Sequence, residues 1–113
     1  MTDKEPTDCE LLELAARAAG YTFDGQVLRN NKTDFEYDGW NPLTDDGDAL
    51  RLAVILTINV LVMQSACQVE YWDNKAMKHA LNIGVNEGDC GGDIFVATRR
   101  AITRAAAEIG KTL

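Results

Sequence analysis

The feature that most constrains this chain is a corner at Asn41 and Pro42, where a strand-like segment meets a helix-like one. Proline disfavours the helical conformation for the residue before it and has no N–H to donate to a sheet, so a strand through residues 35–40 should end here. Thr44 is a suitable N-cap for a helix over residues 44–56, because its hydroxyl can accept a hydrogen bond from a first-turn N–H. Apolar residues then recur at helical spacing, at Ala49, Leu52, Ala53 and Leu56.

The first turn of this helix is strongly acidic. Asp45, Asp46 and Asp48 meet the positive end of the helix dipole there, which stabilises a helix by about 0.3–1 kcal/mol for each carboxylate. Trp40 looks exposed beside the corner, so a second interpretation is a ligand site in which its indole ring is a stacking face. We favour the first interpretation, because the helix dipole accounts for the carboxylates without a ligand.

Two further helices are expected near the ends of the chain. Thr7 and Glu10 have the spacing of a capping box, and Gly20 supplies a stop for the first of them. Asp93 is a suitable cap for the last helix, and Gly110 should end it. The last helix carries three arginines, Arg99, Arg100 and Arg104. Arg100 and Arg104 are four positions apart and therefore share a face.

Short strands are expected between these helices. Asp24-Gly25 is a strong hairpin signal, and Phe35 and Tyr37 alternate with Glu36 and Asp38 as expected of a half-buried strand. A further strand is favoured near residues 57–63, which are rich in β-branched residues. Another strand should lie around residues 69–72, residues 74–84 are ambiguous between strand and helix, and the glycine-rich loop at residues 88–92 should be the most mobile element. The order α-β-β-α-β-β-α predicts one α+β domain over residues 1–113, with residues 1–6 frayed. A central antiparallel sheet covered by helices, an α-β-α sandwich, is the expected architecture.

Charge is uneven along the chain, whose net charge is −7. Residues 1–50 hold twelve acids and four bases, whereas residues 51–113 hold six acids and seven bases. The acidic half disfavours direct binding to a nucleic-acid backbone. It favours contact with a basic partner surface or mimicry of nucleic acid, although solubility alone also explains such a charge.

Neither a metal site nor a membrane segment is predicted. The three cysteines, Cys9, Cys67 and Cys90, are far apart in the sequence, and there is one histidine, so we expect free thiols and no structural zinc. The first residues lack the pattern of a secretory signal, and polar residues interrupt the longest apolar run. A cytoplasmic protein without metal or cofactor is therefore expected.

An enzyme is not expected either, because no nucleophile–base pair can be named. Ser65 lacks the context of a nucleophile elbow, and His79 and Cys67 have no recognisable partner in the sequence. The loop at residues 88–92 lacks the lysine of a phosphate-binding loop.

Four arginines remain to be explained, namely Arg51, Arg99, Arg100 and Arg104. In one interpretation they pair with the acidic first turns and hold the helices together, since arginine is a common partner of carboxylates. In the other they hold the phosphates of a ligand whose base stacks on Trp40 or Trp72.

Residues 11–20, 40–52 and 98–110 together resemble a known family. They are similar to small phage and prophage proteins with the phage α-β-α sandwich domain, which are related to NinX-like proteins. The resemblance implies a phage accessory protein in the cytoplasm of an infected bacterial host and a helix–sheet–helix sandwich. It implies no agreed activity and no functional residues.

From these observations we expect a non-enzymatic phage protein that binds and neutralises a host defence component, with a protein effector as the first choice. One alternative is a sponge that sequesters a nucleotide immune signal, and another is a structural or regulatory phage protein, as a homodimer, without a role against host defence. The candidate binding residues are Trp40, Asn41, Asp45, Asp46, Asp48, Arg51, Trp72, Arg99, Arg100 and Arg104.

Overall fold

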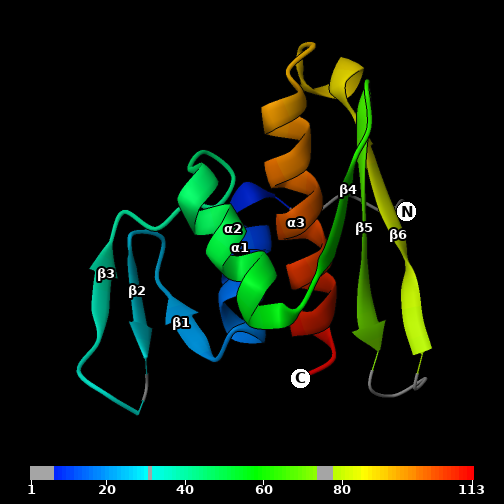
Figure 1. Ribbon diagram of the computed structural model, residues 1–113. Coiled ribbons are helices and arrows are strands. Elements are labelled where there is room, and N and C mark those ends of the chain that lie inside the picture. The colour runs from blue at the N-terminus through cyan, green and yellow to red at the C-terminus, as the bar shows by residue number, and fades with distance from the viewer. Residues whose placement is uncertain (1–6, 31, 74–77) are drawn as a thin grey trace, which may run out of the picture.

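Three helices occupy the centre of the fold, and a small antiparallel sheet lies on either side of them (Figure 1). The computed structural model describes residues 7–30, 32–73 and 78–113, so the expected fraying of residues 1–6 lies outside it. In chain order the elements are α1 (Asp8–Ala18), β1 (Tyr21–Phe23), β2 (Val27–Asn30), β3 (Glu36–Asp38), α2 (Asp46–Leu56), β4 (Asn59–Val62), β5 (Ala66–Asp73), β6 (Lys78–Asn86), the short 3₁₀ helix η1 (Glu87–Cys90) and α3 (Ile94–Lys111).

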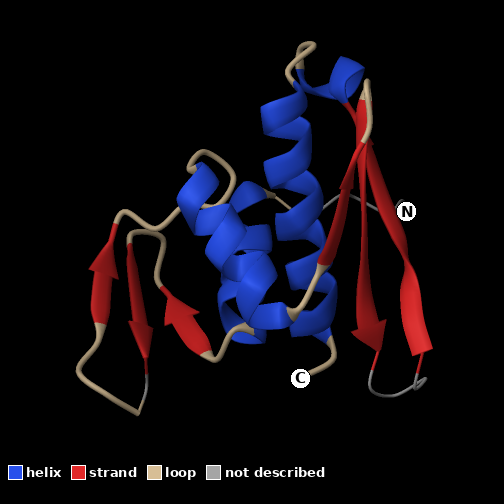
Figure 2. Ribbon diagram, viewed as in Figure 1, coloured by secondary structure: helices blue, strands red, loops and turns tan. Residues whose placement is uncertain are grey.

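The α+β class and the antiparallel pairing are confirmed, but the expected central sheet is two sheets. Their strand orders are β1-β2-β3 and β4-β5-β6, and Figure 2 shows the helices between them. The reason lies in α3, which is buried on several sides through small residues such as Ala97, Ala101 and Ala105. A helix that is apolar on several sides needs neighbours on each of them. Helix α3 therefore packs against α1, α2 and the second sheet together.

The caps of α1 and α3 are confirmed. Thr7 and Glu10 form a capping box, in which the backbone N–H of Glu10 donates to the Thr7 hydroxyl at 3.2 Å and the N–H of Thr7 donates to the Glu10 carboxylate at 3.1 Å. Asp93 accepts hydrogen bonds from the first-turn N–H groups of Phe95 and Val96. Local capping rules therefore identified where both helices begin.

Gly110 was predicted to end α3, but the helix continues to Lys111. Gly110 is buried where α3 crosses α1, and a Cβ atom added to it would overlap the backbone carbonyl of Leu14. Its function is thus to let the two helix backbones approach each other closely.

The N-cap of α2 is Asp45, so the prediction of Thr44 was wrong. The carbonyl oxygen of Asn41 accepts hydrogen bonds from the N–H groups of Thr44 and Asp45, at 3.2 and 2.9 Å. Thr44 belongs to this turn, and its hydroxyl therefore faces the carbonyl oxygen of Asn41 instead of the helix. The Asp45 carboxylate caps the helix by accepting from the N–H of Asp48 at 2.8 Å.

Trp40 is a core residue, although the sequence suggested an exposed one. Only 6% of its surface is exposed, and its ring packs edge-on against Phe23 with 5.3 Å between ring centroids. The strand β1 brings Phe23 into this position, and such a contact between distant segments is not encoded in the local pattern around Trp40. The first sheet is thereby joined to the hydrophobic core.

Candidate functional site

The predicted corner site is a structural junction in which polar groups satisfy one another. The Asp48 carboxylate, which is 1% exposed, accepts a hydrogen bond from the backbone N–H of Asn41 at 3.0 Å and from the guanidinium of Arg51 at 2.8 Å. The hydrogen bond with Asp48 raises the pKa of Arg51. The side-chain oxygen of Asn41 accepts a hydrogen bond from the N–H of Leu43. The corner is thus fixed to α2 by its own side chains.

The arginines of α3 pair with the acidic starts of the other two helices. Arg99 donates to the Asp46 carboxylate at 2.6 Å and to the carbonyl oxygen of Leu43 at 2.9 Å, which ties α3 to α2. Arg100 donates to Asp8 at 3.1 Å, which ties α3 to α1. Arg104 is half-buried and also has an interaction partner. The interpretation in which arginines hold the helices together is confirmed for Arg99 and Arg100.

These positions bring only part of the predicted ligand site together. Arg99 and Asp46 meet at the start of α2, whereas Arg100 lies against α1. Trp40 is buried and offers no open ring face for a stacked base. Trp72 belongs to β5 and pairs in register with His79, but its side chain lies outside what the structure describes.

An apolar cleft of about 470 Å³ opens beside this junction, between α2, β4 and α3. Leu50 and Phe95 stand at it with 64% and 65% of their surfaces exposed. Its two charged lining residues, Asp46 and Arg99, neutralise each other. We call this the apolar cleft, and its lining comprises Asp46, Ala49, Leu50, Val60, Val62, Ile94, Phe95, Thr98, Arg99 and Ile102.

Exposed apolar side chains continue from the cleft over α2 and β4. Val54 and Leu61, which do not line the cleft, are also largely exposed, with 70% and 57% of their surfaces open. The strand β3 is exposed, which corrects the expectation of a half-buried strand at Phe35 and Tyr37. The whole of β4 is exposed as well. The cause is the position of α3, which packs mainly under β5 and leaves β4 uncovered.

Sequence reasoning missed this surface, although it left a signal. The segment of α2 has a buried apolar face at Leu52 and Ala53, and a second, exposed apolar face at Leu50 and Val54, which are four positions apart. A helix of a monomer that packs on one side needs only one such face. The second face predicts a further contact, which none of the described elements supplies.

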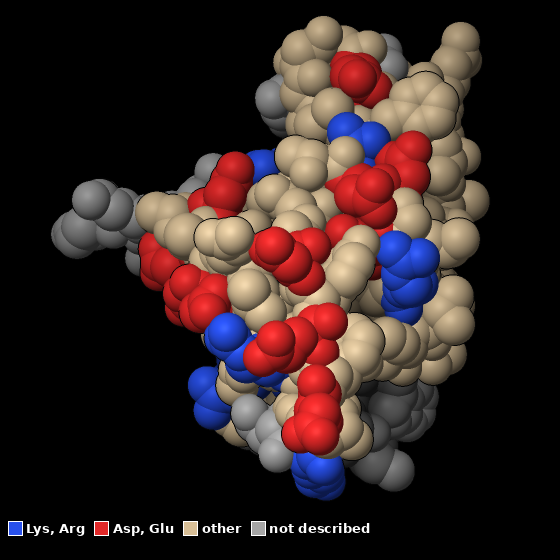
Figure 3. Space-filling view, turned by 90° about the vertical axis from the view of Figure 1, so that its left-hand side faces the viewer, with Lys and Arg blue, Asp and Glu red and all other residues tan. Residues whose placement is uncertain are grey.

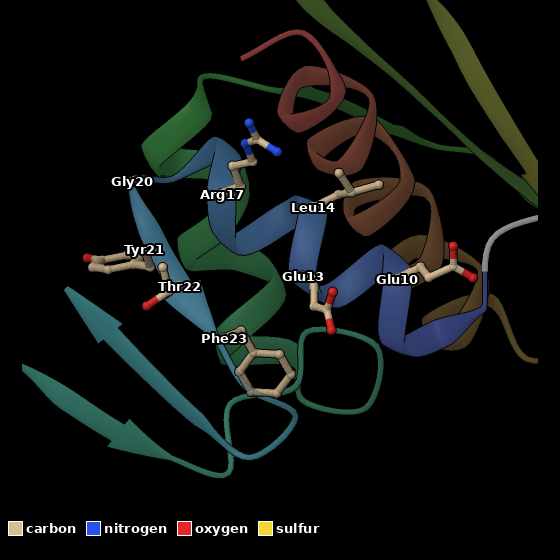
Figure 4. A pocket seen from close by; sticks show the side chains of 8 residues that line it. All are labelled: Glu10, Glu13, Leu14, Arg17, Gly20, Tyr21, Thr22 and Phe23. Carbon is tan, nitrogen blue, oxygen red and sulfur yellow. The ribbon is translucent and has the colours of Figure 1, made fainter. Parts of the chain in front are cut away.

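A second cleft, of about 700 Å³, lies between α1 and β1 (Figure 4). Figure 4 shows the side chains of Glu10, Glu13 and Arg17 spread along α1 without converging on one point. Glu10 belongs to the capping box, whose hydrogen bond from the Thr7 backbone lowers the pKa of Glu10. Arg17 donates to the carbonyl oxygen of Leu113 at 3.0 Å. Two of its charged groups therefore already serve the fold, which makes this cleft the weaker candidate.

Acidic side chains gather on the side of the molecule that carries β3 and the start of α2 (Figure 3). Arg29 neutralises part of this face by pairing with Asp24 at 2.8 Å and Glu36 at 3.2 Å. The exposed acids of β3, of the turns next to β2 and β3, and of the start of α2 are Asp24, Asp34, Glu36, Asp38, Asp45 and Asp46. The apolar cleft thus adjoins a surface with excess negative charge.

Other kinds of site find little support in the described residues. No group of three or more His, Cys, Asp or Glu side chains there is arranged to hold a metal ion. Cys9, Cys67 and Cys90 are free thiols, and burial raises the pKa of Cys67. Among the helices of the described ranges, none is both long and apolar enough to cross a membrane. None of the family models, curated proteins or solved structures compared with the chain matches it.

Proposed function

We propose that this chain is a non-enzymatic binding protein that captures a protein partner through the apolar cleft. The observation that carries the proposal is the open apolar surface formed by α2, β4 and the start of α3, with Leu50 and Phe95 largely exposed. Contiguous exposed apolar surface is costly in water and commonly marks an interaction site. A partner that covers this surface would gain the free energy of burying it.

The polar groups of the cleft support binding instead of catalysis. Asp46 is paired with Arg99, and the Thr98 hydroxyl donates to the carbonyl oxygen of Ile94 at 2.8 Å. Catalysis by a side chain needs a nucleophile or base that is free to meet the substrate. Among the described lining residues, the charged and hydroxyl groups are already engaged with the protein itself.

The partner that we propose is an effector of host defence whose contact surface is basic. The acidic face beside the cleft favours such a surface through charge complementarity. The resemblance to small phage proteins makes a defence effector the first class to test. Neutralisation would follow from covering the basic surface that the effector needs for its own function.

A plaque assay tests this proposal. Bacterial strains that each carry one defence system are infected with a phage that the system restricts, with and without the co-expressed protein. We expect the protein to restore plaques in at least one strain and Phe95→Asp to lose this effect, since losing a central apolar anchor typically costs about 2 kcal/mol, about thirtyfold in affinity. Leu113→Asp is the matched control, because Leu113 is 63% exposed but lies away from the cleft.

Two results would count against the proposal. If Phe95→Asp restores plaques as well as the unchanged protein, the cleft is not the contact surface. If no restricted strain responds to the unchanged protein at all, the role against host defence is wrong.

A further inference from the structure

We infer that the partner adds to β4 as an extended strand that carries lysine or arginine; this inference rests on the proposed function. It concerns the way in which the apolar cleft is occupied. Three observations carry it: the open edge of β4, the position of the cleft beside that edge, and the charge around both.

The outer edge of β4 offers free backbone groups at Val60 and Val62. The N–H of Met63 donates to the carbonyl oxygen of Ala66 at 2.8 Å, which makes this pair the first hydrogen-bonded pair of the β4–β5 ladder. Hydrogen-bonded pairs alternate in an antiparallel ladder, so Val60 and Val62 direct their N–H and C=O groups away from β5. In the described part of the chain, β4 pairs with β5 alone.

The same two residues place the apolar cleft next to this edge. Val60 and Val62 both line the cleft with their side chains. Along a strand, successive side chains point to opposite faces of the sheet, and residues that are paired across two strands point to the same face. Every second side chain of an added strand would therefore face the cleft, while its backbone continues the sheet. Backbone bonds and pockets for alternate side chains are what strand addition needs.

The edge lacks the features that usually protect an exposed strand. Residues 58–63 contain no charged residue and no proline, and they include three β-branched residues. Exposed edges are usually protected by lysine, proline or a cover, because they otherwise pair with other chains. The open edge of β4 thus has the character of a pairing site.

Charge selects the occupant. A second copy of the chain would bring another net charge of −7. At the start of α2, the three carboxylates of Asp45, Asp46 and Asp48 lie beside the two guanidinium groups of Arg51 and Arg99, which leaves one negative charge in excess there. Like charges oppose self-association, whereas opposite charges favour association with a basic partner. A strand with apolar residues at alternate positions, flanked by lysine or arginine, fits both the cleft and its surroundings.

Selection from a displayed library of random twelve-residue peptides against the full chain tests this inference. We expect enriched peptides with apolar residues at every second position and with lysine or arginine beside them. An enriched peptide is then labelled and its affinity measured by fluorescence anisotropy for four proteins: the unchanged chain, Val62→Pro, Val62→Thr and Phe95→Asp.

The two variants separate the backbone from the side chain. Val62→Pro removes the outward N–H without removing a bond of the β4–β5 ladder, and proline is tolerated at such an edge position. Val62→Thr keeps both the N–H and the β-branched shape. We expect both variants to weaken binding, because each changes a side chain that lines the cleft. The proline variant should bind about tenfold more weakly than the threonine variant, because it alone lacks the outward N–H. Thermal unfolding should show that both variants fold.

Each contrary result has its own meaning. Peptides with helical spacing, or peptides that bind Val62→Pro as well as the unchanged chain but lose binding to Phe95→Asp, overturn strand addition and leave the proposed cleft standing. Peptides that bind Val62→Pro and Phe95→Asp as well as the unchanged chain count against the cleft as well. A library without any enriched peptide has the same meaning. A chain that is dimeric by light scattering, but monomeric as Val62→Pro, shows that a second copy fills the edge and overturns the basic partner.

Discussion

At the residue scale, a single carboxylate decides where α2 begins. Asp45 accepts the hydrogen bond from the N–H of Asp48, whereas the Thr44 hydroxyl is exposed and only faces Asn41 at 3.5 Å. Asp45→Ala should lower the free energy of unfolding by about 1 kcal/mol, and the control Thr44→Ala by less than about 0.5 kcal/mol. Denaturant unfolding measures both. Equal losses for the two variants would contradict this assignment of the cap.

The carboxylate of Asp24 should make stability depend on pH in the acid range. Hydrogen bonds from the N–H of Val27, the guanidinium of Arg29 and the N–H of Gln26 lower its pKa from 3.8 to about 2. Since the folded-state pKa lies below the unfolded value, the charged carboxylate stabilises the fold above about pH 4, and this contribution is lost as the pH falls through about 2.

The variant Asp24→Ala tests this dependence. We expect it to be less stable than the unchanged protein at about pH 6 and to approach its stability near about pH 2. Denaturant unfolding at a series of pH values gives the difference. A difference that stays constant between these pH values would mean that the Asp24 carboxylate is not preferentially stabilised in its charged form.

Local rules predicted some residues of the site and missed others. The pairing of Arg99 with an acidic helix start follows from the types of residue in the sequence, and the structure confirms it. The burial of Trp40 depends on Phe23, which lies seventeen positions away and on another element. Exposure that is set by such distant contacts cannot be derived from the neighbours of a residue in the chain.

At the scale of elements, the crossing of α1 and α3 depends on Gly110. A Cβ atom at this position would lie 2.8 Å from the carbonyl carbon of Leu14 and would overlap its oxygen. Gly110→Ala should therefore lower the free energy of unfolding by about 2–3 kcal/mol, because the two backbones must move apart. Gly88→Ala is the control, since an added Cβ there meets no atom within 4 Å. Thermal or denaturant unfolding with similar losses for both variants would contradict a close crossing.

Strand β4 shows why a sequence pattern can identify an element but not its surroundings. The β-branched residues at Ile58, Val60 and Val62 correctly predicted a strand near residues 57–63. Their β-branched shape does not tell whether either face is buried: α3 covers β5 and leaves β4 exposed on both faces. Burial of a strand is decided by the layer that packs on it, and the local pattern does not contain that layer.

At the scale of the whole molecule, the alternation of helices with groups of antiparallel strands was predictable, but the third strand of each group and the layering were not. Caps and the Asp24-Gly25 turn marked the helices and the first hairpin, because they act within a few residues. The division into two sheets depends on which hairpins share an edge. Helix α2 separates the two hairpin segments along the chain, and the central position of α3 then keeps the sheets apart.

The uneven charge of the molecule should make partner binding sensitive to salt. A peptide with lysine or arginine, enriched on the full chain, should bind more weakly as the salt concentration rises from about 0.05 to about 0.5 M, because screening shortens the reach of the acidic face. The loss should arise mainly in the association rate, which a biosensor measures. A control peptide with its basic residues replaced by uncharged ones should show little change. Salt-independent binding of the basic peptide would contradict the role of the acidic face.

Hydrogen exchange of the full chain, alone and with an enriched peptide, tests the central claim most directly, because the library selection does not favour any one surface. We predict slower exchange in residues 46–50, 60–62 and 94–102, which contain the lining of the apolar cleft, with the strongest protection at the amides of Val60 and Val62. Protection confined to residues 10–23, around the second cleft, or to β3 would contradict the claim that α2, β4 and α3 form the binding surface.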